Sequence, residues 1–324
     1  MDFFYNAPER VVDEVIGGLA RIAPVKRSAE THGVRVVVDR DWNKQRVAVL
    51  SGGGAGHEPS HAGFVGKGML AGAIAGDIFT SPSVEAVLAA IRHVTGPPGC
   101  LLIVKNYTGD VMNFEMASEM AACGVATVLT DDDVAVETST YSTGRRGVAG
   151  TMIVEKIVGA AAETGRDLAA LKTLGDRVNL QTRSMGVALT SCTVPAAGSP
   201  TFQIGENEME MGVGIHGEPG RKRVALAEAK DIAAEMIGAI HKDFGDQAKG
   251  NAILLVNGFG GTPLMELYLM HHCVEQELAG SRITIVRSLV GNYVTSLEMA
   301  GCSVTLSLVD NELLGLWDAP VHTA

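Results

Sequence analysis

The amino-acid sequence predicts an α/β protein made of two α/β domains. Short apolar runs typical of buried strands alternate with longer segments of helical period along most of the chain. Glycine makes up 39 of the 324 residues and aromatic residues only 5%, a balance that suits helices and loops packed closely against a sheet. At roughly 100–200 residues per domain, a chain of this length also predicts two domains.

The first half of the chain repeats the order strand, loop, helix. Its predicted strands are Val47–Leu50, Met69–Gly76, Cys100–Lys105 and Val125–Leu129. One helix begins at Ser81 and Pro82, which suit an N-cap and a first turn, and a second helix follows Asn106–Asp110. Because strands joined through helices run parallel, we expect a largely parallel sheet flanked by helices on both faces.

A domain boundary is expected near Thr193–Pro200 (TVPAAGSP), where two prolines, a glycine and small residues favour a linker. Predicted helices over Val148–Thr164 and Arg166–Ser184 lead up to this boundary. We therefore assign residues 1–192 to the N-terminal domain and 193–324 to the C-terminal domain, which is expected to hold a smaller mixed sheet with helices. Its strands are predicted at Glu206–Ile215, Ala252–Val256, Ile283–Val286 and Ser303–Leu308, and its helices at Val224–Phe244 and Leu264–Leu278.

The composition argues against several classes of partner. Lys and Arg number 26 and Asp and Glu 37, so the net charge of −11 disfavours nucleic acid and anionic membrane surfaces. The five cysteines are scattered and never form a CxxC pair, which indicates buried thiols in a reducing cytosol. Without a signal-peptide pattern or a run of 18 apolar residues, we expect a cytoplasmic protein that binds small molecules or proteins.

The most informative segment is Ser51–His61 (SGGGAGHEPSH), a glycine-rich run between a predicted strand and an expected helix start at Glu58–Pro59. Glycines here let a ligand approach bare backbone N–H groups at a helix N-terminus. A nucleotide-binding P-loop would require Lys and Ser or Thr after its last glycine, and His57 and Glu58 stand there instead. A tight turn in which His57 caps the helix is the alternative.

Two motifs suggest metal binding, and both have a stronger alternative. His57–His61 (HEPSH) matches the letters of the zinc motif HExxH, but Pro59 and the preceding glycines are incompatible with the helix interior that this motif requires. We therefore disfavour zinc, with or without His216 as a third ligand. Asp131–Asp133 are candidate ligands for Mg²⁺, although an acidic turn explains them better.

Two further segments offer groups for catalysis. In Lys105–Asp110 (KNYTGD), at the carboxyl end of a predicted strand, Asp110 is either a general acid or base or an N-cap, and Lys105 either fixes an oxygen or is a solvated strand end. In Gly214–Gly220 (GIHGEPG), glycines leave His216 accessible as a base, metal ligand or nucleophile, or as an ordinary turn histidine.

Six stretches taken together resemble the dihydroxyacetone kinase family, specifically its substrate-binding K subunit. They follow one another in the family's order over nearly the whole chain, and their joint presence is far more specific than any one motif. The stretches are Ser51–Gly68, Lys105–Asp110, Thr143–Thr151, Gly212–Gly220, Asn257–Pro263 and Gly291–Thr305.

The resemblance implies a two-domain α/β homodimer that binds a short ketose such as dihydroxyacetone or erythrulose. The histidine matching His216 forms a covalent hemiaminal with the carbonyl carbon of the substrate. The loop residues matching Gly54, Ala55, Gly56 and His57 hold the hydroxyls, and the lysine matching Lys105 lines the site. The aspartate matching Asp110 works with His57 in proton transfer to and from the reacting hydroxyl.

The resemblance also implies a partner, because the sequence ends at Ala324 without the helical nucleotide-binding domain of the single-chain kinases. A separate L subunit would hold Mg²⁺ and ADP or ATP, with a phosphotransferase-system protein as one possible source of the phosphoryl group. No cofactor is expected on this chain itself. Two other functions remain open, a non-catalytic ketose-binding co-activator and an aldolase-like or isomerase enzyme that uses His216.

Overall fold

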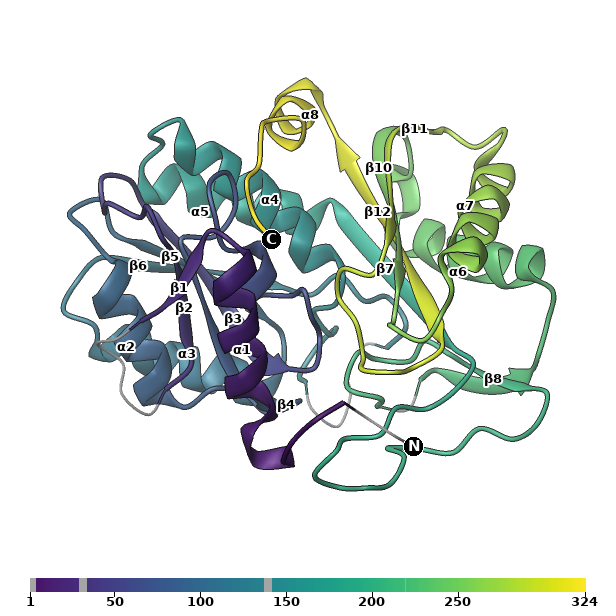
Figure 1. The fold of residues 1–324 in the computed structure, drawn as a ribbon. Coiled ribbons are helices and arrows are strands. Elements are labelled where there is room, and N and C mark those ends of the chain that lie inside the picture. Colours follow the sequence, from purple (N-terminus) through teal and green to yellow (C-terminus); the bar gives the residue numbers. More distant parts are fainter. Residues whose placement is uncertain (1–3, 29–33, 137–141, 219) are drawn as a thin grey trace.

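The computed structural model describes residues 4–28, 34–136, 142–218 and 220–324, and it contains two sheets with helices around and between them (Figure 1). Each sheet has six strands, in the orders β1-β2-β4-β3-β5-β6 and β11-β10-β12-β7-β8-β9. The expected two α/β units are therefore confirmed. In the described part of the chain, no helix has the length and apolar character needed to span a membrane.

The first sheet is parallel in its centre and antiparallel at one edge. Strand β3 pairs in parallel with β4 and β5, and β5 pairs in parallel with β6, whereas β2 is antiparallel to both β1 and β4. The strands are β1 (Val25–Arg27), β2 (Val36–Asp39), β3 (Ala48–Ala55), β4 (Gly72–Ile78), β5 (Cys100–Lys105) and β6 (Val125–Thr130). The helices are α1 (Val11–Ile22), α2 (Val84–Val94) and α3 (Thr108–Met120).

Helix α2 begins later than the sequence indicated. Ser83, rather than Ser81, is its N-cap, and the Ser83 hydroxyl accepts a hydrogen bond from the Ala86 N–H at 3.3 Å. The short strands β1 and β2, at the antiparallel end of the first sheet, and the helix α1 were not expected from the sequence. Strands of three and four residues are too short to give a readable alternation of apolar and polar side chains.

The second sheet is mixed, as expected. Strands β10 and β11 are parallel, and the other neighbours are antiparallel. It has as many strands as the first, so it is not the smaller sheet that was expected. Its elements are β7 (Thr182–Ala188), β8 (Glu208–Met211), β9 (Lys222–Ala225), β10 (Gly250–Gly258), β11 (Ile283–Gly291), β12 (Gly301–Val309), α6 (Ala229–Phe244), α7 (Leu264–Leu278) and α8 (Asn311–Trp317).

Strand β7 corrects the prediction of a helix over Arg166–Ser184. The helix α5 (Leu168–Leu180) ends before this strand, and the chain then enters the second sheet between β12 and β8. The alternation of apolar and polar side chains along β7 becomes clear only when its partner strand β12 is considered. Met185 packs in the core beneath α6 and α7, whereas the Ser184 hydroxyl lies 2.7 Å from that of Thr305 on β12. The second sheet therefore begins before the expected linker.

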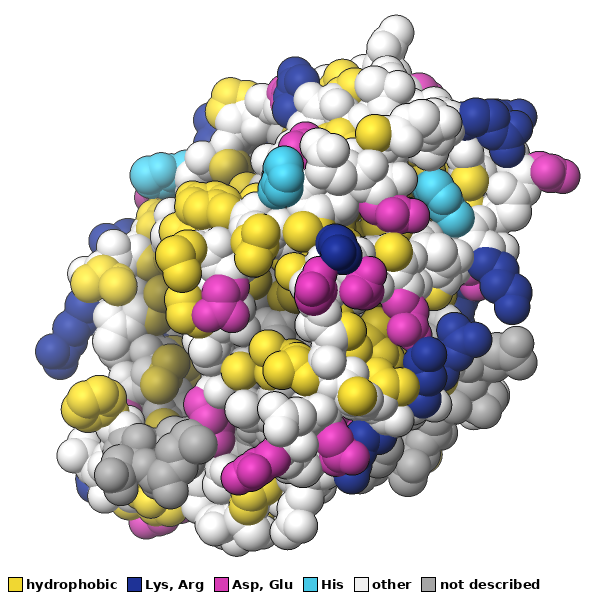
Figure 2. All heavy atoms as spheres, turned by 90° about the vertical axis from the view of Figure 1, so that its right-hand side faces the viewer, with side chains coloured by type: hydrophobic (Ala, Val, Ile, Leu, Met, Phe, Trp, Pro, Cys, Tyr) yellow, Lys and Arg dark blue, Asp and Glu magenta, His cyan; other side chains and the backbone are white. Residues whose placement is uncertain are grey.

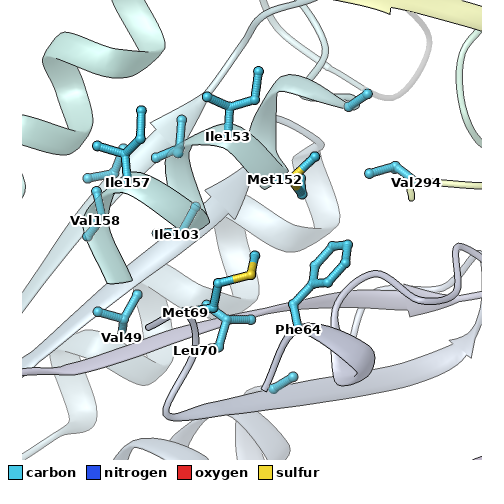
Figure 3. Packing of buried hydrophobic residues seen from close by; sticks show 14 of the residues in the cluster. Val49, Phe64, Met69, Leu70, Ile103, Met152, Ile153, Ile157, Val158 and Val294 are labelled. Carbon is cyan, nitrogen blue, oxygen red and sulfur yellow. The ribbon is translucent and has the colours of Figure 1, made fainter. Parts of the chain in front are cut away.

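Helix α4 (Gly150–Glu163) lies between the two sheets and joins their cores. It contacts β3, β5 and β6 of the first sheet and β7 and β12 of the second. Every residue from Gly150 to Ala162 is buried, so α4 is enclosed on nearly all sides, as expected of a central helix. Figure 3 shows its side chains Met152, Ile153, Ile157 and Val158 among Val49, Phe64, Met69, Leu70, Ile103 and Val294 from the surrounding segments.

The glycine-rich run is mostly strand rather than turn. Strand β3 continues through Ala55, and the turn starts only at Gly56. The close approach of the neighbouring backbone requires these glycines, since a Cβ on Gly52 would lie 2.5 Å from the Ile74 carbonyl oxygen. A helix was expected to begin at Glu58–Pro59, but none begins there. A single 3-10 turn follows at Ala62–Phe64.

Candidate active site

A cavity of about 640 Å³ lies where loops of both sheets meet. The first sheet supplies residues from the carboxyl ends of β3 and β4 and from the start of α3, and the loops before and after β8 supply the rest. This is the edge at which open α/β sheets bind ligands. The lining residues are Gly54, Phe79, Thr80, Ser81, Tyr107, Thr108, Gly109, Asp110, Asn113, Val194, Thr201 and His216.

His216 enters this cavity from the second sheet, and Glu218 holds it there. The Glu218 carboxylate accepts a hydrogen bond from the His216 backbone N–H at 2.9 Å, and its other oxygen lies 3.4 Å from Nδ1 of the ring. Gly214 makes room for this contact, because a Cβ there would lie 2.2 Å from the Glu218 carboxylate. Nδ1 thus faces a buried carboxylate, which leaves Nε2 as the ring nitrogen available for a ligand.

Glu218 is 3% exposed and was not singled out from the sequence. Burial alone would raise the pKa of its carboxyl, but the hydrogen bond with His216 and the charges of His216 and Arg146 outweigh burial and lower that pKa to about 2. Glu218 therefore carries a full negative charge beside the imidazole. Its position in the GIHGEPG motif was the available signal; Pro219 of that motif lies outside the described residues.

His57 lies directly against His216 and is completely buried. The two rings meet edge to face with centroids 4.7 Å apart, and Phe79 stacks on His57 with centroids 5.0 Å apart. The Thr295 carbonyl oxygen, 2.7 Å from Nδ1, can only accept, so Nδ1 carries the hydrogen. Nε2 is then unprotonated, and it has no hydrogen-bond partner among the described residues.

The environment of His57 favours its neutral form. Burial, together with the charges of His216 and Lys105, holds its pKa well below the usual value. A neutral imidazole with a free lone pair has the chemistry of a proton acceptor. Phe79 and Tyr107 complete this aromatic group, and the Tyr107 ring meets that of His216 at 4.4 Å. Neither aromatic residue stood out in the sequence.

Asp110 lies in the first turn of α3 and faces the cavity. Tyr107, not Asp110, is the N-cap of this helix. The Asp110 side chain is nearly buried, its Oδ1 atom has no hydrogen-bond partner within the described ranges, and its Oδ2 atom lies 3.8 Å from Nζ of Lys105. A carboxylate with a free oxygen at a cavity wall, near a helix N-terminus that stabilises its charge, can accept a hydrogen bond or a proton.

Lys105 occupies a different place from the one that its motif indicated. It is 1% exposed, lies behind the glycine-rich strand, and is not one of the residues that line the cavity. Its Nζ donates to the Gly52 carbonyl oxygen at 3.2 Å. A Cβ on Gly53 would lie only 2.4 Å from this Nζ, so the lysine can occupy its place only because residue 53 is glycine. Its charge thus acts on the site from beneath the strand.

Of the loop residues, Gly54 lines the cavity, whereas Ala55 and Gly56 lie behind it. The Gly56 N–H donates to the Glu58 carboxylate at 3.0 Å, so this group already has a partner. The Ala55 carbonyl oxygen accepts from the Phe79 N–H at 2.9 Å, which fixes Phe79 against the loop.

In the acidic run Asp131–Asp133, the side chains of Asp132 and Asp133 bind other parts of the protein. The Asp132 carboxylate accepts from the Val148 and Gly150 N–H groups at the start of α4, and Asp133 pairs with Arg146 at 2.6 Å. Across residues 4–28, 34–136, 142–218 and 220–324, no three His, Cys, Asp or Glu side chains are grouped so as to hold a metal ion.

A scan against protein families matches a Dak1 domain over residues 18–324. The chain belongs to the Dak1 domain family. This Dak1 domain is 46% identical to the dihydroxyacetone-binding subunit of PTS-dependent dihydroxyacetone kinase 1 from Listeria innocua, over 98% of each chain. The resemblance to the dihydroxyacetone kinase family is thereby confirmed.

Two solved structures share the fold of this Dak1 domain over nearly its whole length. One is the dihydroxyacetone kinase of C. freundii in complex with AMP-PNP and Mg²⁺, at a TM-score of 0.90 and 37% identity, covering 99% of this chain and 60% of the kinase chain. The other is a dihydroxyacetone kinase operon co-activator, at a TM-score of 0.90 and 34% identity, covering 96% of each chain.

Proposed function

We propose that this Dak1 domain is the substrate-binding subunit of a dihydroxyacetone kinase. It binds a short ketose, dihydroxyacetone or one like erythrulose, as a covalent hemiaminal on His216 and presents a hydroxyl of that ketose for phosphorylation. The observation that carries this proposal is the contact between His216 and His57 beside Asp110. His216 and Asp110 line the cavity, whereas His57 is not one of its lining residues and lies directly against the His216 ring.

The covalent step uses His216 and Glu218. Nε2 adds to the carbonyl carbon, and the π electrons of the C=O bond move to its oxygen. That oxygen takes up a proton from solvent, and the imidazole releases its Nδ1 proton to solvent. Protons and charge therefore balance. Glu218, on the Nδ1 side, selects the tautomer in which Nε2 has its lone pair free.

Covalent attachment explains how so small a substrate is oriented. A three- or four-carbon ketose offers few atoms to hold, and a C–N bond fixes its reacting hydroxyl more firmly than hydrogen bonds do. It also selects carbonyl compounds over glycerol-like alcohols. His57 Nε2 or the Asp110 carboxylate then removes the hydroxyl proton as the oxygen attacks phosphorus.

The phosphoryl donor belongs, in this proposal, to a separate L-type subunit that holds Mg²⁺ and ADP or ATP. Among the described residues, those that line the cavity include no lysine or arginine that would bind phosphates. The name of the Listeria innocua relative, PTS-dependent, supports a phosphotransferase-system protein as the source of the phosphoryl group. We further propose a cytoplasmic homodimer.

The proposal is tested by intact-protein mass spectrometry under native conditions after incubation with dihydroxyacetone or erythrulose. We expect one adduct, with the mass of one ketose, that depends on His216. The His216→Ala variant should form none, and His241→Ala, which changes a histidine on α6 outside the cavity, should label like the wild type. An adduct that persists in His216→Ala would remove the basis of the assignment.

A regulatory ketose-binding function is the second candidate, because the co-activator structure is as similar to this chain as the kinase structure is. Both functions would use His216, but a sensor needs no base. His57 with a free Nε2 and Asp110 with a free Oδ1 favour the kinase. Ketose phosphate formed on addition of an L-type subunit and a phosphoryl donor would exclude a purely regulatory role, and turnover without a partner would point to an aldolase-like or isomerase enzyme.

A further inference from the structure

Behind the glycine-rich strand, four buried titratable side chains form a continuous row that the proposed function does not use in full. Nδ1 of His61 lies 2.6 Å from a Glu155 carboxylate oxygen, and Nε2 of His61 lies 2.8 Å from Nζ of Lys105. Nζ in turn lies 3.8 Å from Asp110. All four side chains are 5% exposed or less. His61 is the second histidine of the HEPSH motif.

The donors and acceptors in this row can be assigned from their chemistry. The Lys105 ammonium has no lone pair, so it donates to Nε2 of His61, and the hydrogen of the imidazole is then on Nδ1. From Nδ1 it is donated to Glu155, with the Ser51 hydroxyl oxygen a second contact at 3.3 Å. Burial and the Lys105 charge lower the pKa of His61, in agreement with a neutral ring.

Lys105 connects this row to the reacting groups. Its Nζ lies directly beneath Gly53 and beside Asp110, and its charge contributes to the low pKa of His57. The position of one ammonium group therefore influences both proposed proton acceptors. A lysine side chain has four rotatable bonds. Contacts with the Gly52 carbonyl oxygen and Asp110 alone would not fix where Nζ lies, because nothing would hold it on the side that faces His61.

We propose that Glu155 and His61 are positioning residues that hold the Lys105 ammonium beneath the glycine-rich strand, so that it supports proton transfer by Asp110 and His57. This inference rests on the proposed function. It explains why α4, a helix buried on nearly all sides, contains an acidic residue at a position where packing alone would favour an apolar one. A carboxylate is costly to bury unless its charge and hydrogen bonds are used.

The test is a double-mutant cycle on His61→Leu and Lys105→Met, measured as kcat/KM for the ketose with an L-type subunit and its phosphoryl donor. If His61 acts through Lys105, each change should lower kcat/KM by about 100-fold, mostly in kcat, and the double variant should be no worse than Lys105→Met. Additive losses would overturn the inference, because they indicate independent effects on the fold.

Two further variants keep the test decisive if His61→Leu does not fold. Glu155→Gln retains an oxygen that accepts from Nδ1 and should stay within about 10-fold of the wild type, whereas Glu155→Leu should lose about as much as Lys105→Met. A folded Glu155→Gln as inactive as Lys105→Met would contradict the positioning role. Asp132→Asn, a change at a buried carboxylate outside the row, serves as the structural control.

The covalent adduct separates this inference from the proposed function. Adduct formation requires His216 but not the row, so His61→Leu should still form the adduct to roughly the wild-type extent while phosphoryl transfer falls. Equal loss of adduct and transfer would show a structural role and refute the inference. If the wild-type protein forms no adduct and transfers no phosphoryl group, the proposed function itself fails.

Discussion

Glu218 is the residue that orients the His216 ring. Its carboxylate fixes the backbone N–H of His216 and faces Nδ1, so it determines both where the ring points and which nitrogen is free. The same contacts lower the pKa of the Glu218 carboxyl from 4.5 to about 2. The charged form of Glu218 therefore stabilises the folded protein as well as orienting the ring.

The stability of the folded state should consequently depend on pH through Glu218. A carboxyl whose pKa is lower in the folded state than in the unfolded state contributes stability above about 4.5 and loses it as the pH falls toward about 2. Urea unfolding should show Glu218→Gln less stable than the wild type at about pH 7, with the difference shrinking by about pH 3. A difference that stays constant with pH would contradict this account.

His57 and Asp110 should affect phosphoryl transfer more than ketose binding. Each has an acceptor atom without a hydrogen-bond partner among the described residues, close to His216, the proposed attachment point of the ketose, and removal of a general base typically lowers a rate about 10²–10⁴-fold. His57→Asn and Asp110→Asn should therefore reduce kcat by this order while the extent of adduct formation changes little. Adduct mass spectrometry and steady-state kinetics on the same preparations measure the two effects. Parallel losses of binding and rate would argue against the catalytic assignment.

At the scale of the elements, α4 packs closely against its surroundings, and Gly159 makes that packing possible. A Cβ on Gly159 would lie 2.4 Å from the Cα and the carbonyl oxygen of Met69. The helix therefore presses directly on the backbone that follows the glycine-rich loop. Glu155 and Lys156, on the same helix, bring their charges into the interior between the sheets.

Two glycine-to-alanine substitutions in helices should have opposite effects. Gly238 in α6 is exposed, and no atom lies within 4 Å of the position that an alanine methyl would occupy, so Gly238→Ala should stabilise the protein by about 0.5–1 kcal/mol through helix propensity. Gly159→Ala has the same gain in helix propensity, but its methyl group would push the backbones of α4 and Met69 apart. It should therefore destabilise the folded protein by about 1–3 kcal/mol. Urea unfolding of both variants measures the contrast, and a stabilised Gly159→Ala would show that α4 can move away from Met69.

At the scale of the whole molecule, the cavity exists only because loops of both sheets meet. His216 comes from the second sheet, whereas His57 and Asp110 come from the first, and α4 holds the two sheets together. A second feature at this scale is the side of the molecule that carries α6 and α7. Figure 2 views this side and shows hydrophobic side chains gathered over much of its centre, with acidic side chains among them.

This side of the molecule is our proposed homodimer surface. Leu264, Met265, Tyr268 and Leu269 project from one face of α7 with 48–77% exposure, and β11 beside it is an edge strand that pairs only with β10 among the described strands. Met265→Glu and Leu269→Glu should convert a dimer into a monomer, as measured by light scattering coupled to size exclusion. Leu180→Glu, at the 61% exposed end of α5, is the matched control. A wild-type monomer at micromolar concentration would refute the proposal.

The sequence predicted the central strands and the longer helices well, because their side-chain patterns are local. Strand β5 and helix α7 have the predicted bounds, Cys100–Lys105 and Leu264–Leu278. Strand β7 was predicted as the end of a helix, since its alternation depends on a core and on the partner strand β12, which lies far away in the sequence. Local pattern alone does not contain that information.

The sequence by itself determined the fold class and the membership of a family, and it singled out the segments that carry His57, Asp110 and His216. Spaced motifs are sufficient for this because each one reflects a local requirement for glycine or for a reactive side chain. Only the tertiary structure decided that Lys105 lies behind the glycine-rich strand, with His61 and Glu155 beyond it. Burial and hydrogen-bond partners come from segments distant in sequence, so they follow from the packing of α4 between the two sheets and not from any motif.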